Sequence, residues 1–341
     1  MKAAVVRGPG QLCVEDMPEP RPGEYDALCE LLFGATCTGT DSHIIDGSFP
    51  WTSPLPTVLG HESVGRVVRV GAKVRHYRLG DLVTRVGTPP AGGYSVTWGG
   101  FAEFGLARDH WAMCADGVPA DQWQGSRWNQ VVPCGVPATT APMFTTWRET
   151  LSYLTRLGFA AGASLLVLGS GGNGLAYARH ASLLGAGLVA MAGAAYAEAP
   201  ARRQAGVGVY LDYRRPDLAE ALNAAHPEGF DFIIDAVGRI GNGDRVLACL
   251  KPGGRYGTYG VDDVGKITLN RALARGDFTD MPCSYDEAET HQRVSEWVMQ
   301  GQLDPALWYD PGQVWPLARI DEAFAAVRAR VSPKALVRLR G

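Results

Sequence analysis

The sequence has no closely spaced cysteine pair and no long apolar run. Its seven cysteines are scattered through 341 residues, and none belongs to a Cys-x-x-Cys pair. This spacing argues against a disulfide framework and favours a cytoplasmic protein in a reducing compartment. No apolar run approaches the roughly 18 residues of a membrane span, and the N-terminus lacks the apolar core of a signal peptide. We therefore expect no membrane partner.

An excess of charge of one sign is also missing. The sequence carries 32 Lys and Arg against 35 Asp and Glu, which leaves a formal net charge of −3 and no basic stripe. Such a chain has no general attraction to nucleic acid. Its 46% hydrophobic and 20% charged residues are typical of a globular protein. A chain of 341 residues exceeds one hydrophobic core, so we expect two domains.

The clearest positive feature is a glycine-rich turn between an apolar run and a helical pattern. In a Gly-x-Gly-x-x-Gly turn the first glycine allows a tight bend, the second lets the backbone approach a pyrophosphate, and the third lets the helix pack on the strand. The phosphates then lie at the positive end of the helix. We assign a dinucleotide site to this turn, with the residues Gly169, Gly171, Gly172, Asn173 and Gly174.

The rest of the chain divides by pattern. Residues 1 to about 110 contain short apolar runs broken by Pro-Gly and Gly-Asp turns, which predicts an all-β region. From Trp147 to about Leu269 expected strands alternate with helices, which is the pattern of a doubly wound parallel sheet. The tail from Glu287 onward reads as two helices and a last strand, and we expect it to fold back on the N-terminal domain.

Cofactor choice is predicted from the end of the second strand of this sheet. An NAD enzyme normally places an acid there, which grips the ribose 2′-hydroxyl. The segment 189–195 offers no acid, and Arg202 and Arg203 follow nearby. These arginines are equally explained as surface charge on a helix. The pattern favours NADP over NAD.

Three clusters stand out: Thr38-Gly39-Thr40-Asp41-Ser42-His43, Gly60-His61-Glu62 with the Val70-Gly71 and Gly80-Asp81 turns, and the glycine turn with Asp235-Ala236-Val237-Gly238. Together they resemble one family, the medium-chain dehydrogenases/reductases in their zinc-type alcohol, polyol and sugar dehydrogenase branch. The resemblance covers essentially the whole chain. It implies that Val237 and Gly238 also contact the cofactor and that Gly193 occupies the position of the usual acid.

The resemblance implies a specific architecture. A Rossmann doubly wound parallel sheet, residues 147–272, would be inserted into a GroES-like, mainly-β catalytic domain of residues 1–146 and 273–341. Members of this family commonly pair through the edge of the nucleotide-domain sheet, near the segment Ile267–Leu273 of this chain. A homodimer or homotetramer is therefore expected.

The resemblance also implies a zinc site, and here the sequence departs from its relatives. His61 matches the family's histidine ligand and Glu62 its acidic neighbour, but Thr38 stands where the family has a cysteine. Cys37 comes one residue early. Because neighbouring side chains of a strand point to opposite faces, Cys37 would need a local kink to reach the metal.

Two residues, Cys37 and Glu149, are candidates for a further ligand. Counting back from the glycine turn to the position of the ligand in the family leads to Thr145 and Thr146. Glu149 lies about one helical turn further on. Glu149 is more simply explained as a solvated acid near a helix start, stabilised by the helix dipole. The family's second, structural zinc is not expected, because residues 82–113 contain no cysteine; the loop 87–100 takes its place.

Acid–base roles follow from the same resemblance. Thr40 and His43 match the relay that carries the substrate proton to solvent, and Asp41 matches the acid that orients the zinc-binding histidine. A hydroxyl and an imidazole of near-neutral pKa form a workable proton path.

The leading hypothesis is an NAD(P)-dependent alcohol dehydrogenase or reductase, zinc-assisted, that acts on a secondary alcohol or ketone of a polyol, cyclitol or sugar-like small molecule. One alternative is a zinc-free medium-chain reductase of an activated C=C bond. The other is a catalytically inactive nucleotide-binding protein.

Overall fold

The computed structural model describes residues 1–340, which form two compact units. The first unit joins Met1–Arg148 to the segment that begins at Glu287, and the second is Glu149–Asp286. The second unit thus extends beyond the expected end at residue 272. The reason is β14 (Thr279–Met281), which hydrogen-bonds to the sheet of that unit.

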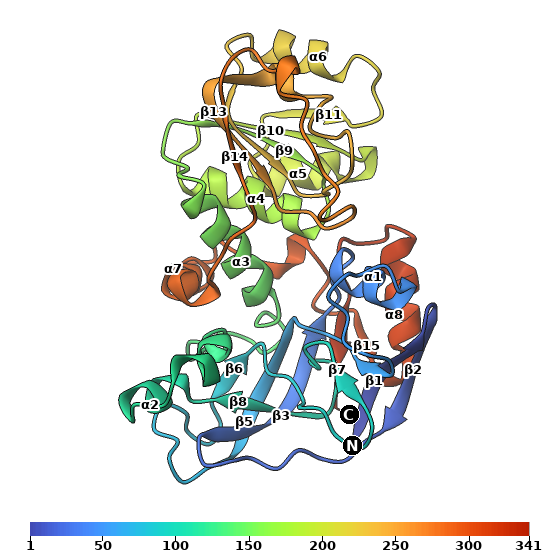
Figure 1. Cartoon of the computed structure of the whole chain (residues 1–341), viewed down its shortest axis with the longest axis vertical. Coiled ribbons are helices and arrows are strands. Elements are labelled where there is room, and N and C mark those ends of the chain that lie inside the picture. Colours follow the sequence, from blue (N-terminus) through green and yellow to red (C-terminus); the bar gives the residue numbers. More distant parts are fainter. Residues whose placement is uncertain (341) are drawn as a thin grey trace. The chain divides into compact units, whose positions relative to one another are not determined.

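The second unit is built on one parallel sheet (Figure 1). Its strand order is β11-β10-β9-β12-β13-β14, which is the doubly wound order that the alternating pattern predicts. The strands are β9 (Ser164–Leu168), β10 (Leu188–Gly193), β11 (Val209–Asp212), β12 (Phe230–Asp235), β13 (Leu250–Thr258) and β14. All five residues of β9 are buried, as expected for a strand covered on both faces.

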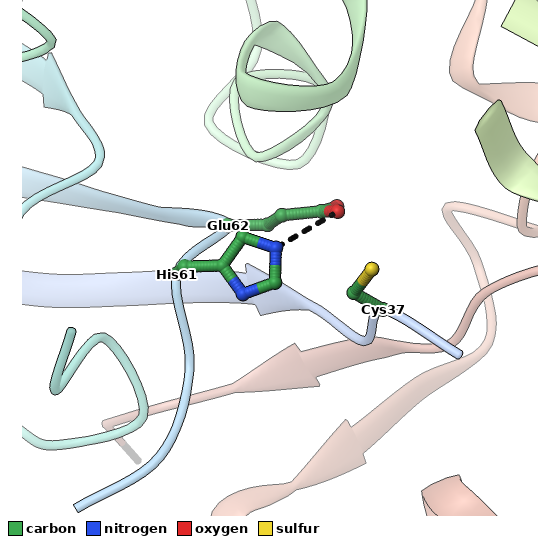
Figure 2. A group of neighbouring side chains, drawn as sticks. All are labelled: Cys37, His61 and Glu62. Carbon is green, nitrogen blue, oxygen red and sulfur yellow. Dashed lines mark ion pairs between the residues drawn. The ribbon is translucent and has the colours of Figure 1, made fainter. Parts of the chain in front are cut away.

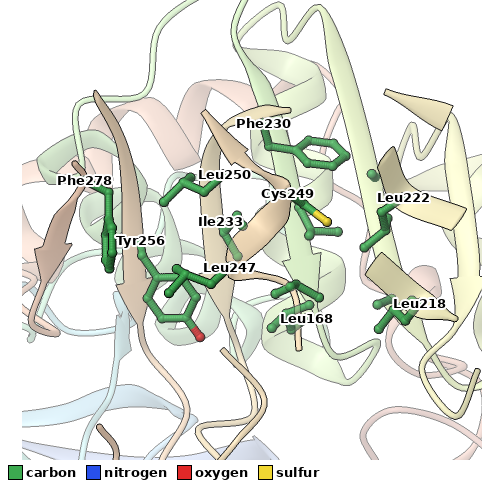
Figure 3. Close-up of a cluster of buried hydrophobic side chains, with 14 residues drawn as sticks. Leu168, Leu218, Leu222, Phe230, Ile233, Leu247, Cys249, Leu250, Tyr256 and Phe278 are labelled. Atoms are coloured by element: carbon green, nitrogen blue, oxygen red, sulfur yellow. The ribbon is translucent and has the colours of Figure 1, made fainter. Parts of the chain in front are cut away.

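Helices and apolar side chains cover this sheet. The helices are α4 (Gly172–Leu183), α5 (Glu198–Gln204) and α6 (Leu218–Ala225). Figure 3 shows the core on one side, where Leu218 and Leu222 of α6 face Leu168 and Ile233 of the strands. Full burial of each such side chain contributes about 1.5–3 kcal/mol to folding. The alternating sequence pattern of this region therefore corresponds to a real two-sided core.

The first unit contains two sheets. One has the order β2-β1-β4-β7, with β1 (Lys2–Gly8), β2 (Gln11–Asp16), β4 (Thr57–Val58) and β7 (Ser95–Val96). The other has the order β15-β16-β3-β5-β6, with β8 paired to β3. Its strands are β3 (Asp26–Ala35), β5 (Ser63–Val70), β6 (Leu82–Thr84), β8 (Phe104–Arg108), β15 (Val314–Pro316) and β16 (Leu336–Arg338).

The chain's tail completes this second sheet. Strand β16 pairs antiparallel with β3, so the C-terminal strand folds back on the N-terminal region as the sequence predicts. Helices of the first unit include α1 (Thr40–Asp46), α2 (His110–Ala115), α7 (Glu287–Met299) and α8 (Ile320–Arg328). Helix α1 corrects the expectation of an all-β N-terminal region. Helix α3 (Met143–Arg156) crosses the division between the units.

Short 3₁₀ turns complete the described elements. They are Ala120–Gln122, Gln124–Ser126, Ala195–Ala197, Leu247–Cys249, Arg271–Leu273, Pro305–Leu307 and Leu317–Arg319. None of the helices within residues 1–340 combines the length and the apolarity needed to cross a membrane.

Candidate metal centre and nucleotide turn

Three potential metal ligands come together in the first unit. The Sγ atom of Cys37 and ligand atoms of His61 and Glu62 all lie within 4.8 Å of one another, and all three residues are buried (Figure 2). His61 Nε2 is 3.7 Å from Glu62 Oε1. Two ligands around a tetrahedral zinc are about 3.4 Å apart, so ligand atoms within 4.8 Å of one another are close to the spacing that one ion needs.

The local backbone explains why Cys37 rather than Thr38 joins the cluster. Strand β3 ends at Ala35, and the chain then leaves extended geometry for a turn at 38–39. The alternation of faces therefore stops before Cys37. Cys37 is buried in the cluster, whereas Thr38 is exposed to solvent. Cys37, and not Thr38, therefore lies beside His61 and Glu62, and the set of residues that bind a metal remains a prediction.

Asp41 and His61 are held as a pair. Asp41 Oδ1 lies 3.4 Å from His61 Nδ1, and Asp41 Oδ2 accepts the backbone N–H of Cys37 at 2.8 Å. Burial lowers the pKa of the His61 imidazole, but hydrogen bonding and charge from Asp41 and Cys37 outweigh burial and raise that pKa to about 10. A carboxylate at Nδ1 leaves Nε2 to face Glu62, which is the usual orientation of a metal-binding histidine.

Glu62 is held by two residues that the sequence analysis did not select. Its Oε1 atom accepts hydrogen bonds from Lys334 Nζ at 2.5 Å and from Thr146 Oγ1 at 3.0 Å. Lys334 is only 2% exposed. Burial raises the pKa of Glu62 although Lys334 and His61 oppose it, and the Glu62 charge raises the pKa of Lys334 against burial. The other oxygen, Oε2, has no hydrogen-bond partner among the described residues.

Lys334 could be found only through tertiary structure. It lies just before β16, whose pairing with β3 brings it beside Thr36, where its Nζ donates to the carbonyl at 3.3 Å. In the sequence it is one lysine between a proline and an apolar run. Nothing local distinguishes it from a surface lysine.

Glu149 is not part of this ligand group. It is buried in the second unit, where its Oε2 atom accepts a hydrogen bond from Tyr259 Oη at 2.9 Å. The interpretation of Glu149 as a solvated acid is therefore wrong, because its carboxylate is 7% exposed and internally paired.

Thr40 and His43 lie on one short helix. Thr40 begins α1, and His43 follows three residues later on the same face. His43 Nδ1 is 2.9 Å from Ser48 Oγ, and Ser48 is exposed. The sequence analysis did not select Ser48, although it is an exposed hydroxyl within hydrogen-bond distance of His43.

The three glycines of the turn in the second unit differ in backbone angle and in the space for a side chain. Gly169 has φ +102°, and a Cβ at Gly174 would lie 2.0 Å from the Gly169 carbonyl oxygen. By contrast, a Cβ at Gly171 would meet no atom within 4 Å. Gly171 is the N-cap of α4 and offers no side-chain cap. The turn therefore packs tightly at its first and third glycines and leaves open space at its second, where a pyrophosphate would approach.

The other expected cofactor residues surround the same sheet edge. Val237 and Gly238 each donate a backbone N–H to Asp235 Oδ1 at 2.9 Å. A Cβ at Gly193 would lie 2.3 Å from Tyr210 Oη, so a larger side chain does not fit there without movement.

The two arginines after β10 differ. Arg202 Nη1 donates to the Gly208 carbonyl at 2.7 Å, and its Nε pairs with Glu198 at 2.9 Å. Both arginines are exposed. Arg202 supports the local fold through these contacts, so Arg203 is the better candidate to meet a cofactor phosphate.

Comparison with known proteins matches both units. Residues 29–117 match the alcohol dehydrogenase GroES-like domain, and residues 205–332 match the zinc-binding dehydrogenase model. The chain is 30% identical over 277 residues to the L-threonine 3-dehydrogenase of Anaeromyxobacter dehalogenans, covering 76% of this chain and 77% of that one. It is 25% identical over 284 residues to the sorbitol dehydrogenase of Halalkalibacterium halodurans, covering 79% and 80%.

A solved structure shares the fold. It comes from Sinorhizobium meliloti 1021, is described as a zinc-binding dehydrogenase and was determined bound to NADP. Its TM-score is 0.77 at 22% identity, covering 99% of this chain and 98% of that one.

Proposed function

Because this chain belongs to the medium-chain dehydrogenase/reductase family, in its zinc-type branch, we propose that it interconverts a secondary alcohol and its ketone at a zinc ion held by Cys37, His61 and Glu62. The protein is an NAD(P)-dependent dehydrogenase. Its substrate class, on this proposal, is a polyol, cyclitol or sugar-like small molecule. The sorbitol dehydrogenase relative supports that class.

The observation that carries the proposal is the convergence of a thiol, an imidazole and a carboxylate in one buried cluster. Three protein ligands with a fourth position open are the usual set of a catalytic zinc. A metal ligand must be deprotonated, so His61 counts as neutral in the zinc-bound state, while Cys37 as a thiolate, Asp41 and Glu62 bring three formal negative charges. Lys334 brings one positive charge, so two negative charges remain, which one Zn²⁺ would neutralise.

Each residue has a defined task. A bound zinc supplies a Lewis acid that polarises the alcohol or carbonyl oxygen. His61 binds through Nε2 while Asp41 fixes the Nδ1 side of the ring. Lys334 and Thr146 hold one oxygen of Glu62 and leave Oε2 as the ligand atom.

The proton of the alcohol needs a path to solvent. Thr40 and His43, one helical turn apart, together with Ser48 provide hydroxyl, imidazole and hydroxyl in sequence. An imidazole can hold the proton between the two hydroxyls. A nicotinamide cofactor bound at the glycine turn would supply the hydride chemistry of the reaction.

The alternative of a zinc-free C=C reductase does not need the cluster. A buried cysteine, histidine and glutamate within 4.8 Å have no evident use in such an enzyme. The zinc-dependent reaction is therefore the better supported proposal. A homodimer or homotetramer remains a prediction.

Metal analysis with matched variants tests the proposal. The purified protein should contain zinc, and His61→Ala should lose both the zinc and the turnover of secondary alcohols. Cys37→Ser should weaken zinc binding by about a hundredfold, because a soft anionic ligand becomes a neutral hydroxyl.

Two controls accompany these variants. Thr38→Ala, an adjacent exposed position, and Cys114→Ser, an exposed cysteine of the same unit, should retain zinc. Full alcohol turnover by zinc-free protein would reject the zinc mechanism. Loss of zinc in Thr38→Ala with retention in Cys37→Ser would reject the ligand set.

A further inference from the structure

A small pocket adjoins His61 within the first unit. Its volume is about 190 Å³, and its lining includes His61, Thr88, Trp98 and Trp128. The Trp98 ring lies 5.2 Å from the His61 ring, centroid to centroid. The volume is below the range of about 300–1,000 Å³ that is typical of drug-sized ligands, so the occupant is a single small group. A group in this pocket lies beside the candidate metal ligand.

The backbone holds Trp98 in the pocket wall at a conformational cost. Trp98 has φ +66°, a left-handed conformation that bulky residues rarely adopt. Hydrogen bonds on both sides fix it there: the Thr97 N–H donates to the Val58 carbonyl at 2.9 Å, and the Gly100 N–H donates to the Gly60 carbonyl at 2.6 Å. Glycine would adopt this conformation without strain. Strained residues of this kind cluster at ligand sites, so the strain indicates a function for the indole.

The Trp98 indole is one of a row of aromatic rings. It is half-buried and lies 5.9 Å from the Phe49 ring, centroid to centroid. Phe49 in turn makes an edge contact with Trp51, at 5.3 Å, and Trp51 is 62% exposed. Aromatic side chains therefore extend from the surface of the protein to His61. The Trp98 ring offers an apolar, rigid surface to a molecule bound next to that histidine.

The charged side chains that line the pocket have partners inside the protein. Asp26 Oδ1 pairs with Arg108 Nε at 3.1 Å, and Arg85 pairs with Glu287. The Arg85 guanidinium also lies 4.9 Å from the centroid of the Trp128 ring. A charged ligand would have to compete with these internal partners. The pocket therefore favours a neutral occupant.

One polar group of the pocket has no such partner. Thr88 is 3% exposed, and its Oγ1 atom has no hydrogen-bond partner among the described residues. A buried hydroxyl normally finds one. A hydroxyl of a bound molecule would supply the missing partner. The occupant that fits thus combines an apolar face, for the indole, with at least one hydroxyl.

We propose that this pocket binds the ring of a neutral polyhydroxy alcohol, with the apolar face of the ring against Trp98 and one ring hydroxyl hydrogen-bonded to Thr88. This inference rests on the proposed function and narrows its substrate class from polyols in general to cyclic ones. A six-membered ring with equatorial hydroxyls carries C–H groups on its flat faces and hydroxyls at its rim, so one molecule satisfies both residues. An open-chain polyol has no fixed apolar face and loses more conformational freedom on binding.

Binding without chemistry tests the pocket directly. Full-length protein, with and without zinc, is titrated by calorimetry with 1,5-anhydrosorbitol, a pyranose ring, and with sorbitol, the open chain of the same carbon number. We expect the ring to bind at least about fivefold more tightly in both forms of the protein, because its shape is fixed before binding.

A second ring distinguishes the two sources of this chemistry. The cyclitol myo-inositol is titrated beside the pyranose under the same conditions. Tighter binding of myo-inositol would assign the pocket to a cyclitol, and tighter binding of 1,5-anhydrosorbitol would assign it to a sugar. Either result supports the proposal when the better ring also binds more tightly than sorbitol.

Variants of Trp98 test the apolar face. Trp98→Gly removes the indole and adopts the positive φ without strain, so the protein should fold and bind the ring about tenfold more weakly. Trp98→Phe keeps an aromatic face and should lose about threefold or less. Trp315→Gly removes a half-buried tryptophan of the same unit outside the pocket lining, and this matched control should retain the wild-type affinity.

Variants of Thr88 test the hydroxyl. Thr88→Val keeps the side-chain shape and should weaken ring binding by about twofold to tenfold, the value of one neutral hydrogen bond. The thermal midpoint of the ligand-free protein should rise in the same variant, because a buried polar group without a partner is removed. Thr88→Ser keeps the hydroxyl and should retain the affinity. These variants decide the matter if Trp98→Gly does not fold.

Three results would overturn the inference. The first is sorbitol binding as tightly as both rings. The second is an unchanged ring affinity in a folded Trp98→Gly variant or in Thr88→Val. The third is ring binding that occurs only with zinc present.

Turnover separates this inference from the proposed function. The kcat/KM for the better-binding ring should exceed that for sorbitol by about fivefold or more, and Trp98→Gly should reduce this ratio. Ring binding without turnover of any alcohol would leave the pocket standing and reject the zinc dehydrogenase. Turnover of sorbitol without preferential binding of either ring would reject the pocket and leave the dehydrogenase standing.

Discussion

The two units build their candidate sites from different parts of the chain. In the second unit the site consists mainly of backbone, because one turn of consecutive residues supplies the bend, the open approach and the helix start. In the first unit the site consists of side chains from separate segments: Cys37 follows β3, His61 and Glu62 precede β5, and Lys334 precedes β16. A backbone site depends on local sequence, whereas a side-chain site depends on how distant segments meet.

The largest expected effect comes from breaking the ion pair of Lys334 and Glu62. Lys334→Met leaves the Glu62 carboxylate buried without its cation, and removal of one partner of a buried pair costs about 3–5 kcal/mol. We expect this loss in the free energy of unfolding of metal-free protein, measured in urea. Zinc-loaded protein should lose less, because the ion supplies the missing positive charge.

The matched control for this variant is Lys73→Met. Lys73 pairs with Glu24 on the surface, where an ion pair contributes about 0–1 kcal/mol. A loss in Lys334→Met no larger than in the control would contradict a buried structural pair. An equal loss in the free energy of unfolding with and without zinc would mean that Glu62 does not bind the metal.

The second test compares two glycines of the nucleotide turn. Gly174→Ala places a Cβ 2.0 Å from the Gly169 carbonyl oxygen, so the turn must open. Both thermal stability and NADPH affinity should fall, the affinity by about a hundredfold, or 2.7 kcal/mol. Gly171→Ala meets no protein atom within 4 Å and should keep its stability. Its Cβ occupies the approach of the pyrophosphate, so its affinity should still fall.

Fluorescence titration with NADPH and thermal unfolding measure the two effects, and zinc content should be unchanged in both variants. Wild-type affinity in Gly171→Ala would mean that the pyrophosphate does not approach the second glycine. Wild-type stability in Gly174→Ala would mean that the helix is not packed against the turn.

The sequence was informative where local pattern determines structure. The apolar run 164–168 and the three glycines predict β9, the turn and α4 because buried parallel strands and tight turns leave direct traces in composition. Strand β5 (Ser63–Val70) lies in the region of short apolar runs that predicts strands. Helix α1 was missed because its seven residues are too few for a helical period to become visible.

The first unit's site could be predicted only in part. Motif resemblance selected His61 and Glu62, but the strand rule failed at Cys37 because β3 ends before it. Lys334 has no local signature, since its role comes from burial and from Glu62, a partner far along the chain. Lys334 meets Glu62 only because the tail folds back onto the N-terminal region.

The smallest expected effect concerns cofactor choice. A Cβ at Gly193 would collide with Tyr210 Oη, and no acid ends β10, so the residue that grips the ribose 2′-hydroxyl in NAD enzymes is missing there. We expect NADPH to bind at least as tightly as NADH in a fluorescence titration. A tenfold preference for NADH, about 1.4 kcal/mol, would contradict this prediction. The double variant Arg202→Ala with Arg203→Ala should weaken the binding of NADPH more than that of NADH.

The two single variants sharpen that result. Arg203 is exposed and is available to a phosphate, so Arg203→Ala should weaken NADPH by a few-fold and leave NADH unchanged. Arg202 holds the Gly208 carbonyl and Glu198, so Arg202→Ala should lower the thermal midpoint and weaken both cofactors together. An equal loss for both cofactors in Arg203→Ala would make that arginine ordinary surface charge. Selectivity for NADP would then have to come from the backbone of the segment after β10. The cofactor site of the second unit would in that case consist of backbone atoms alone.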